Sequence, residues 1–496
     1  MTEILLNQAC NCIKQDDIDG ANVLLNKLKA KKETPTRNYH LAILLRDLGH
    51  KIKKIEYINE SIEKFEKLNE KSFEDINFNL GTAYFLKWEL EKENERYLTL
   101  DYEPSLLKAK KLLKKEIIEN DNYDFKKTSI NLANTYNNIG RHIEAIEYYE
   151  HVMNETGSAY AMLNKGIGLY KYSLFLPNPT PILSEAYSYF KQILNDPRSS
   201  SEMKRKAKAF YDDIKWLFDE NILEEYVESE RIRYSNESFE GFMINFCLDY
   251  KLFLNLDNFC QLCPNSVGDT IDIEKLIINI TKELTNEKYD ILSSYLNQIK
   301  MDFVSARFLL ILSQSNHFDL DIITKYTYIS NTSFNEEHDI RIQLLKDSFN
   351  NFFNILDKIA FFINDYLNLE IKRRDVDFRK VWFNFNELTK NKNKKIKTKK
   401  KIHENLKNLN NTGVNALYDI YLELDDKNDK KYLRDTRNAL THRYLRITHD
   451  KQGEDEKTPE ELKNETIELS IIVKNAIIYL MSLIKINEEY KADKFN

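Results

Sequence analysis

The sequence predicts an all-α protein, in which an N-terminal helical solenoid is followed by a C-terminal helical bundle. Only 11 glycines and 8 prolines occur among the 496 residues, too few for the frequent tight turns of sandwiches, barrels and wound sheets. Hydrophobic residues make up 42% and aromatic residues 12% of the chain, more than a disordered protein contains. The formal net charge is -6, so any nucleic-acid binding must be local.

The first 220 residues contain a repeated pattern of small and aromatic residues. In its clearest copy, LANTYNNIGRHIEAIEYYE, Ala133 and Ala145 let two antiparallel helices approach, while Tyr136 and Tyr149 fill the groove beside them. Weaker copies contain Ala9 with Ala21, Leu41 with Ala42, Gly81 with Ala109, and Gly166 with Ala186. The pattern resembles the tetratricopeptide (TPR) repeat. This resemblance implies five stacked helix pairs that form a groove for a protein or peptide ligand.

Residues 221–335 are expected to form a linking helical region. The repeat pattern is lost there, but Lys275 to Met301 and Asp302 to Ser313 keep apolar residues at three- and four-residue intervals, which favours helices. The region also contains FCQLCP, in which Cys260 and Cys263 form a single CxxC. A structural zinc site needs four ligands. We therefore interpret the two cysteines as packed or exposed thiols and expect no metal site.

Residues 336–496 are predicted to form a bundle of four helices. The first is IRIQLLKDSFNNFFNILDKIAFFINDYL, whose apolar residues at three- and four-residue steps mark one buried stripe. The second and third are expected at about His403 to Leu424 and at about Lys430 to His442. The fourth begins at TPEEL, where Thr458 is the expected N-cap and Glu461 completes a capping box.

The chain is expected to be cytoplasmic, with no membrane partner. Its most apolar segment, Leu469 to Ile484, carries Lys474 and Asn475 and is shorter than a membrane span, so it is interpreted as a buried helix. The first residues, MTEILLNQ, lack the basic start and apolar stretch of a secretory signal. Five cysteines then indicate free thiols in a reducing compartment.

The candidate catalytic residues are Arg437, Asn438 and His442, in the segment RNALTH. Asn438 and His442 share one helix face with Arg434, and the long side chain of Arg437 can reach the same spot. A guanidinium binds phosphate oxygens as a fork, an imidazole exchanges protons near cellular pH, and an amide can hold a reacting oxygen. These groups suit metal-free RNA cleavage, although an arginine and a histidine at this spacing also arise by chance.

The same segment resembles the RNxxxH form of the Rx4-6H motif of HEPN domains. FNILDKIAFFINDYL and the following VDFRKVW resemble the long helix and next segment of a HEPN subgroup that is fused behind TPR repeats. The resemblance implies a cofactor-free endoribonuclease of a toxin or antiviral system, in which Arg437 stabilises phosphate charge and His442 acts in proton transfer. It also implies a homodimer through the HEPN domain. Thr441 departs from the family at a position where acidic or other polar residues are common.

RNA binding is expected beside the motif, at Arg434 and Arg443, and in the lysine-rich segment LTKNKNKKIKTKKKIH. Lysines bind a phosphate backbone by releasing its counterions, although such a segment can also be only a solvated, solubilising loop. The candidate lysines are Lys395, Lys397, Lys399 and Lys400.

Two functions remain open from the sequence. In the first, the solenoid senses a partner and the HEPN domain cuts RNA by attack of the ribose 2'-OH on the adjacent phosphate. In the second, the protein is a non-catalytic TPR adaptor or scaffold whose HEPN domain only dimerises or docks RNA. Asp357 has two interpretations as well, since it either orients Arg437 or makes a structural ion pair with Lys358 or a neighbouring helix.

Overall fold

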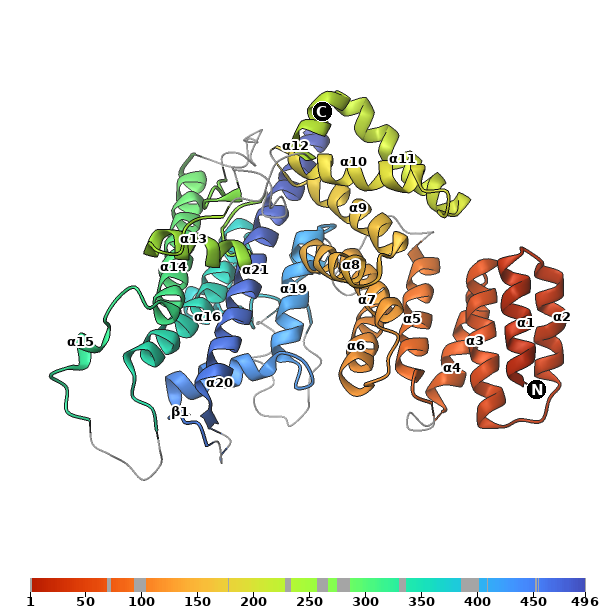
Figure 1. Ribbon diagram of the computed structural model, residues 1–496, viewed down its shortest axis with the longest axis horizontal. Coiled ribbons are helices and arrows are strands. Elements are labelled where there is room, and N and C mark those ends of the chain that lie inside the picture. Colours follow the sequence, from red (N-terminus) through yellow and green to blue (C-terminus); the bar gives the residue numbers. More distant parts are fainter. Residues whose placement is uncertain are drawn as a thin grey trace. The chain divides into compact units, whose positions relative to one another are not determined.

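The computed structural model describes most of the chain. The described residues are 2–68, 73–92, 104–176, 178–227, 233–256, 266–273, 286–329, 336–384, 401–407, 409–450, 453 and 455–495. Over these ranges the regular secondary structure is helical apart from two short strands, which confirms the predicted all-α class. It divides into two compact units, residues 1–169 with 189–209 and residues 170–188 with 210–496 (Figure 1).

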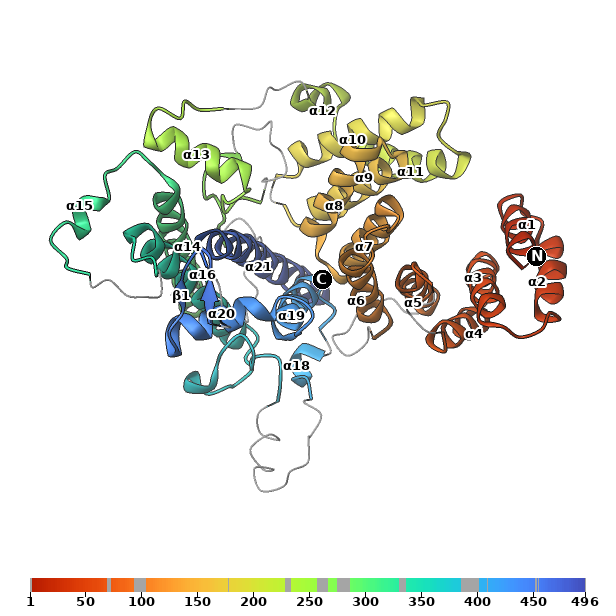
Figure 2. The same cartoon turned by 60° about the horizontal axis from the view of Figure 1, so that its bottom comes forward.

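The first unit is built from antiparallel helix pairs. Its helices are α1 (Thr2–Lys14), α2 (Ile18–Lys29), α3 (Pro35–Lys51), α4 (Ile55–Glu66), α5 (Ile76–Lys92), α6 (Pro104–Glu119), α7 (Phe125–Ile139) and α8 (His142–Thr156), with parts of α9 (Ala159–Ser173), α10 (Thr180–Asn195) and α11 (Ser201–Leu217). Each odd-numbered helix from α1 to α7 packs against the next one, and α4 and α6 also pack against the following pair (Figure 2).

The small residues of the repeat pattern lie where the paired helices approach. Ala133 in α7 and Ala145 in α8 are fully buried, and Tyr136 and Tyr149 pack in the same cluster. A Cβ on Gly166 of α9 would lie 2.8 Å from the Phe190 ring of α10, so that pair too is close enough to require glycine. Burial of apolar surface drives this packing, because one pair cannot cover its own apolar face. The expected helix pairs are therefore confirmed.

The second unit is a helical bundle around one long helix. The long helix is α21 (Pro459–Phe495). Besides parts of α9, α10 and α11, the unit also contains α12 (Glu220–Val227), α13 (Phe239–Asp249), α14 (Asn286–Gln314), α15 (Asp321–Thr324), α16 (Ile340–Tyr366), the 3-10 helix η3 (Arg373–Asp375), α18 (Glu404–Lys407), α19 (Thr412–Asp425), α20 (Lys431–His442), β1 (Arg446–Ile447) and β2 (Glu456–Lys457). Helix α16 packs against α14, α20 and α21, and α19 packs against α20 and α21 (Figure 1). Strands β1 and β2 pair in parallel.

Helix α21 begins and packs as the sequence predicts. The backbone N–H of Thr458 donates to Glu461 Oε2 at 2.9 Å, and the N–H of Glu461 donates to Thr458 Oγ1 at 3.1 Å, which is a capping box. Residues Pro459–Lys491 are long and apolar enough to cross a membrane, but 89% of their apolar window is buried inside the protein. This helix is therefore a core helix of the bundle, as expected for Leu469 to Ile484.

The prediction of a single helix at about His403 to Leu424 is wrong, because the chain forms two helices there, α18 and α19. Asn411 begins the new helix, since its Oδ1 accepts the N–H of Val414 at 3.2 Å. A Cβ on Gly413 would lie only 2.4 Å from the backbone nitrogen of Leu483 in α21. Helix α19 thus starts at its close contact with α21, which helical periodicity does not reveal.

The expected linking region also differs from its prediction. One helix, α14, runs from Asn286 to Gln314 without the break expected at residue 301, and it packs against α16. Residues 275–285, Cys260 and Cys263 lie outside the described residues.

Candidate functional site

The three candidate catalytic residues lie in the last two turns of α20. The guanidinium of Arg437 lies over the ring of Phe353 in α16, with its Cζ 5.8 Å from the ring centroid. Arg437 Nη1 is 3.5 Å from His442 Nε2, so the long arginine side chain spans the five-residue separation as expected. His442 is the last residue of α20 and is exposed, whereas Arg437 and Asn438 are half-buried.

The contact between Arg437 and His442 has a chemical consequence. A guanidinium carries only donors, so a hydrogen bond in this contact needs His442 Nε2 as its acceptor, with the ring proton on Nδ1. A neutral imidazole is the form that can take up a proton. The Thr441 hydroxyl donates to the Arg437 carbonyl at 2.8 Å, so it turns back onto the helix and stays away from the histidine ring.

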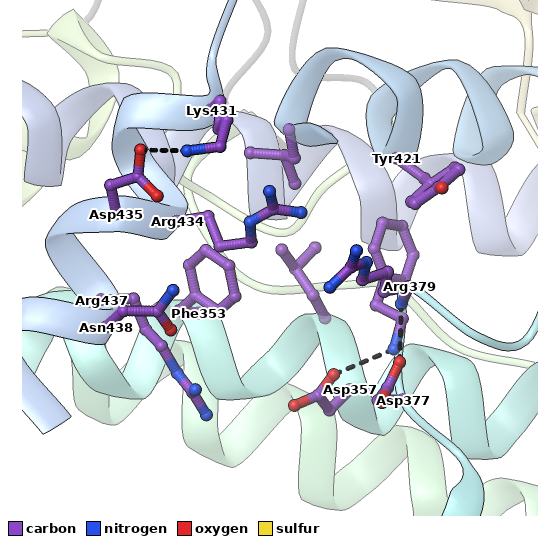
Figure 3. Close-up of a pocket in the computed structure, with 13 residues that line it drawn as sticks. Phe353, Asp357, Asp377, Arg379, Tyr421, Lys431, Arg434, Asp435, Arg437 and Asn438 are labelled. Atoms are coloured by element: carbon purple, nitrogen blue, oxygen red, sulfur yellow. Dashed lines mark hydrogen bonds and ion pairs between the residues drawn. The ribbon is translucent and has the colours of Figure 1, made fainter. Parts of the chain in front are cut away.

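A pocket of about 390 Å³ opens beside Arg437, between α16, α19, α20 and the segment after η3 (Figure 3). Its apolar lining consists of Phe353, Leu356, Phe378, Tyr421 and Leu424. Its polar lining includes Asn438 and both signs of charge, with Arg379, Lys431, Arg434 and Arg437 as cations and Asp357, Asp377 and Asp435 as anions. The pocket is therefore amphipathic, and two of the candidate catalytic residues, Arg437 and Asn438, line it.

The pocket cations differ in their partners. Arg434 forms an ion pair with Asp425 of α19, and Arg379 Nε is 3.5 Å from the same carboxylate oxygen. Lys431 pairs with Asp435. Asp425, on another helix than Arg434, thus supplies the anion that both arginines share.

Arg437 differs from these three cations. Among the described residues it has no carboxylate partner, and its Nε is buried without a hydrogen-bond partner. Among the described residues, Arg437 is therefore the one cation of this pocket without a direct ion pair.

Asp357 has a structural contact of its own. Its Oδ1 accepts the backbone N–H of Phe378 at 2.9 Å, which fixes the segment after η3 to α16. Lys358 instead pairs with Asp302, so the suggested Asp357–Lys358 ion pair is wrong. Burial raises the pKa of Asp357; the Phe378 N–H opposes that shift, and so does the nearby charge of Arg437. Arg437 therefore acts on Asp357 electrostatically, without a hydrogen bond between them.

The other expected RNA-binding residues are only partly described. Arg443 Nη1 lies 3.1 Å from Asp455 Oδ1. Lys395, Lys397, Lys399 and Lys400 lie outside the described residues. Asn384 and Lys401, the described residues on either side of 385–400, are joined, because the N–H of Asn384 donates to the carbonyl of Lys401 at 3.0 Å.

The described part of the chain contains no group of three or more histidine, cysteine or acidic side chains that could hold a metal ion.

Several pocket residues were missed in the sequence, above all Arg379, Phe353 and Tyr421. Arg379 lies in VDFRKVW, and that segment is anchored by Trp382, which is fully buried and packs edge-on against Phe378. The Trp382 Nε1–H donates to the Phe378 carbonyl at 2.7 Å. The sequence signal for Arg379 was its position between two aromatic residues, Phe378 and Trp382. When the aromatic residues on both sides are anchored, the charged side chain between them is held in a fixed place at the surface.

Comparison with known proteins identifies the C-terminal part of the chain. Residues 284–487 match the LA2681-like HEPN family, which confirms the HEPN resemblance. Among solved structures, the crystal structure of MamA protein matches with 24% identity over 42% of this chain and 95% of that one, at a TM-score of 0.24. No curated protein is similar enough to count as a relative.

Proposed function

We propose that the C-terminal unit is a metal-independent endoribonuclease of a toxin or antiviral defence system, acting in the cytoplasm. The observation that carries this proposal is the 3.5 Å approach of Arg437 Nη1 to His442 Nε2, on an exposed helix end inside the region that matches the HEPN family. A fixed positive charge and a ring that can take up a proton are two of the groups that RNA cleavage without a metal uses.

In the proposed reaction, His442 takes the proton of a ribose 2'-OH, and the 2'-oxygen attacks the adjacent phosphorus. Arg437 neutralises the charge that develops on the phosphate oxygens, and Asn438 donates a hydrogen bond to one of them. The bond from phosphorus to the 5'-oxygen then breaks and that oxygen receives a proton. The products are a 2',3'-cyclic phosphate and a 5'-hydroxyl.

One motif supplies only one histidine, whereas the reaction needs a proton acceptor and a proton donor. A homodimer through the HEPN domain would bring a second His442 to the same cleft, and the exposure of His442 is compatible with this arrangement. In the same proposal, the solenoid binds a protein or peptide ligand and regulates the nuclease.

The test is cleavage of labelled tRNA and mRNA by the full chain in the presence of EDTA. Wild-type protein should produce 2',3'-cyclic phosphate ends, and Arg437→Ala and His442→Ala should each lower the rate by about a hundredfold or more. Arg374→Ala is the matched control, because Arg374 is an arginine of the same unit whose side chain is 79% exposed and pairs with its neighbour Asp375.

Three outcomes separate the two functions. Cleavage that is lost in both motif variants and kept in Arg374→Ala supports the nuclease. Cleavage that persists in the motif variants contradicts the assigned residues. A wild-type protein that binds RNA or a partner without cutting any RNA, and that does not arrest growth when expressed, is instead the TPR adaptor.

A further inference from the structure

The pocket beside Arg437 has room that the proposed cleavage chemistry does not use. Its volume of about 390 Å³ lies within the range of roughly 300–1,000 Å³ that is typical of small-molecule sites. Of the two residues of the proposed phosphate chemistry, Arg437 lines the pocket and His442 does not. Leu356, Tyr421 and Leu424 form apolar and aromatic walls. These walls favour a ligand that has a flat group with apolar faces.

The hydrogen-bonding groups left open by the protein limit what this ligand can be. Lys431 pairs with Asp435, and Arg434 and Arg379 share the Asp425 carboxylate. Two charged groups in the described part of the pocket have no ion-pair partner: the guanidinium of Arg437, whose buried Nε has no hydrogen-bond partner, and Asp357, whose Oδ1 alone bonds to Phe378. The neutral polar side chains of Asn438 and Tyr421 also line the pocket.

The two open groups have opposite character and lie at different places in the pocket. In Figure 3, Asp357 and Asp377 lie at the end away from Lys431 and Asp435, and the Arg437 side chain runs beside the Phe353 ring. A ligand that satisfies both groups needs an anion for Arg437, an N–H donor for Asp357 Oδ2, and apolar faces between them. A nucleotide combines a phosphate, a base with N–H donors and a flat ring.

We propose that this pocket is a nucleobase subsite, which holds the base of a ribonucleotide next to the cleaved bond while Arg437 binds the phosphate. The proposal rests on the nuclease function above and adds to it the recognition of one base. The bound base is unstacked from its neighbours and stands against Phe353 and Tyr421, with an N–H donated to Asp357. Since a paired base cannot enter, the preferred substrate is single-stranded RNA.

The experiment measures the binding of the four nucleoside 3'-monophosphates, and of inorganic phosphate, to the full chain by titration calorimetry. Wild-type protein should bind at least one nucleotide about tenfold or more tightly than inorganic phosphate. Asp357→Asn should weaken the binding of that nucleotide about tenfold or more, because a hydrogen bond to a charged group is lost. It should not weaken the binding of inorganic phosphate, since it removes a negative charge near Arg437.

A second variant keeps the test valid if Asp357→Asn does not fold. Phe353→Leu retains an apolar side chain and removes the aromatic face, so nucleotide binding should weaken about fivefold or more. Arg374→Ala is the control and should bind all ligands as the wild type does. Equal binding of all four nucleotides and of phosphate by wild type, or unchanged nucleotide binding in both pocket variants, would overturn the subsite.

An RNA that lacks one base distinguishes failure of the subsite from failure of the nuclease. If the subsite is correct, removing the base beside the cleaved bond lowers kcat/KM about tenfold in wild type and much less in Phe353→Leu. If RNA is cut equally well without that base, the nuclease stands and the subsite fails. If nucleotides bind with the expected dependence on Asp357 but no RNA is cut, the subsite stands and the nuclease fails.

Discussion

Replacing Asn411 by alanine should destabilise the C-terminal unit more than the loss of an ordinary helix cap. The Asn411 side chain is 1% exposed, and both of its polar atoms are used. Oδ1 accepts the N–H of Val414 at 3.2 Å, and Nδ2 donates to the carbonyl of Leu483 at 2.8 Å. One residue therefore caps α19 and joins it to α21.

The expected cost is the sum of these two contacts. Loss of an N-cap costs about 1 kcal/mol, and loss of a buried hydrogen bond that leaves its acceptor without this donor costs about 1–2 kcal/mol. Asn411→Ala should thus lower the free energy of unfolding by about 2–3 kcal/mol. Thr458→Ala is the matched control, since Thr458 contributes its side chain only to the cap of α21, and it should cost about 1 kcal/mol.

Urea unfolding followed by tryptophan fluorescence measures this difference. Of the three tryptophans, Trp382 is fully buried in the C-terminal unit, Trp216 is 86% exposed and Trp88 is buried in the N-terminal unit. In a Trp88→Phe background, the change in fluorescence therefore reports the C-terminal unit. If Asn411→Ala costs no more than Thr458→Ala, the bond to Leu483 does not contribute and the reasoning is refuted.

Two further predictions concern α19 and Asp357. Gly413→Ala would place a methyl group 2.4 Å from Leu483 N and 2.7 Å from the Tyr479 carbonyl, and backbone atoms cannot move aside cheaply, so urea unfolding should show a loss of about 3 kcal/mol; a loss near zero would contradict the close approach. Burial raises the pKa of Asp357 in the folded protein, so the wild type loses stability as pH rises from the unfolded pKa through the folded one. Asp357→Asn should therefore be more stable than wild type at pH 7, by about 1.4 kcal/mol for each unit of the shift, and the advantage should vanish near pH 4 or below. If the difference in stability between Asp357→Asn and wild type does not change with pH, burial does not raise the pKa of Asp357 and the reasoning is contradicted.

The elements that sequence predicted correctly are those fixed by local patterns. The apolar stripe of α16, the capping box of α21 and the small residues of the helix pairs depend on neighbours within a few positions. The contact between Arg437 and His442 belongs to the same class, because five residues on one helix are within reach of a long side chain. These features could therefore be placed before any tertiary contact was known.

The features that sequence did not predict depend on contacts between distant segments. The start of α19 is set by its contact with Leu483, 70 residues after Gly413 in the numbering. The neutralisation of Arg434 comes from Asp425 on another helix. The pocket combines α16, α19 and α20 with the segment that Trp382 anchors. None of these pairings leaves a periodic trace in the sequence, so helical patterns alone could not reveal them.

The backbone contact at Gly413 fixes one end of α19, so a tilt of the helix about this contact displaces its other end. The helix is fixed to α21 at its first turn, and Asp425, which holds Arg434 and Arg379, is at its far end. The twelve residues that follow Gly413 up to Asp425, at about 1.5 Å each, give a length of about 18 Å. A tilt of α19 by roughly 3° about Gly413 therefore moves the Asp425 end by about 1 Å. Displacements of this size are enough to change rates when reacting groups must be aligned. A substitution at Gly413, at the opposite end of α19, should thus shift the guanidinium groups of Arg434 and Arg379 without contacting them.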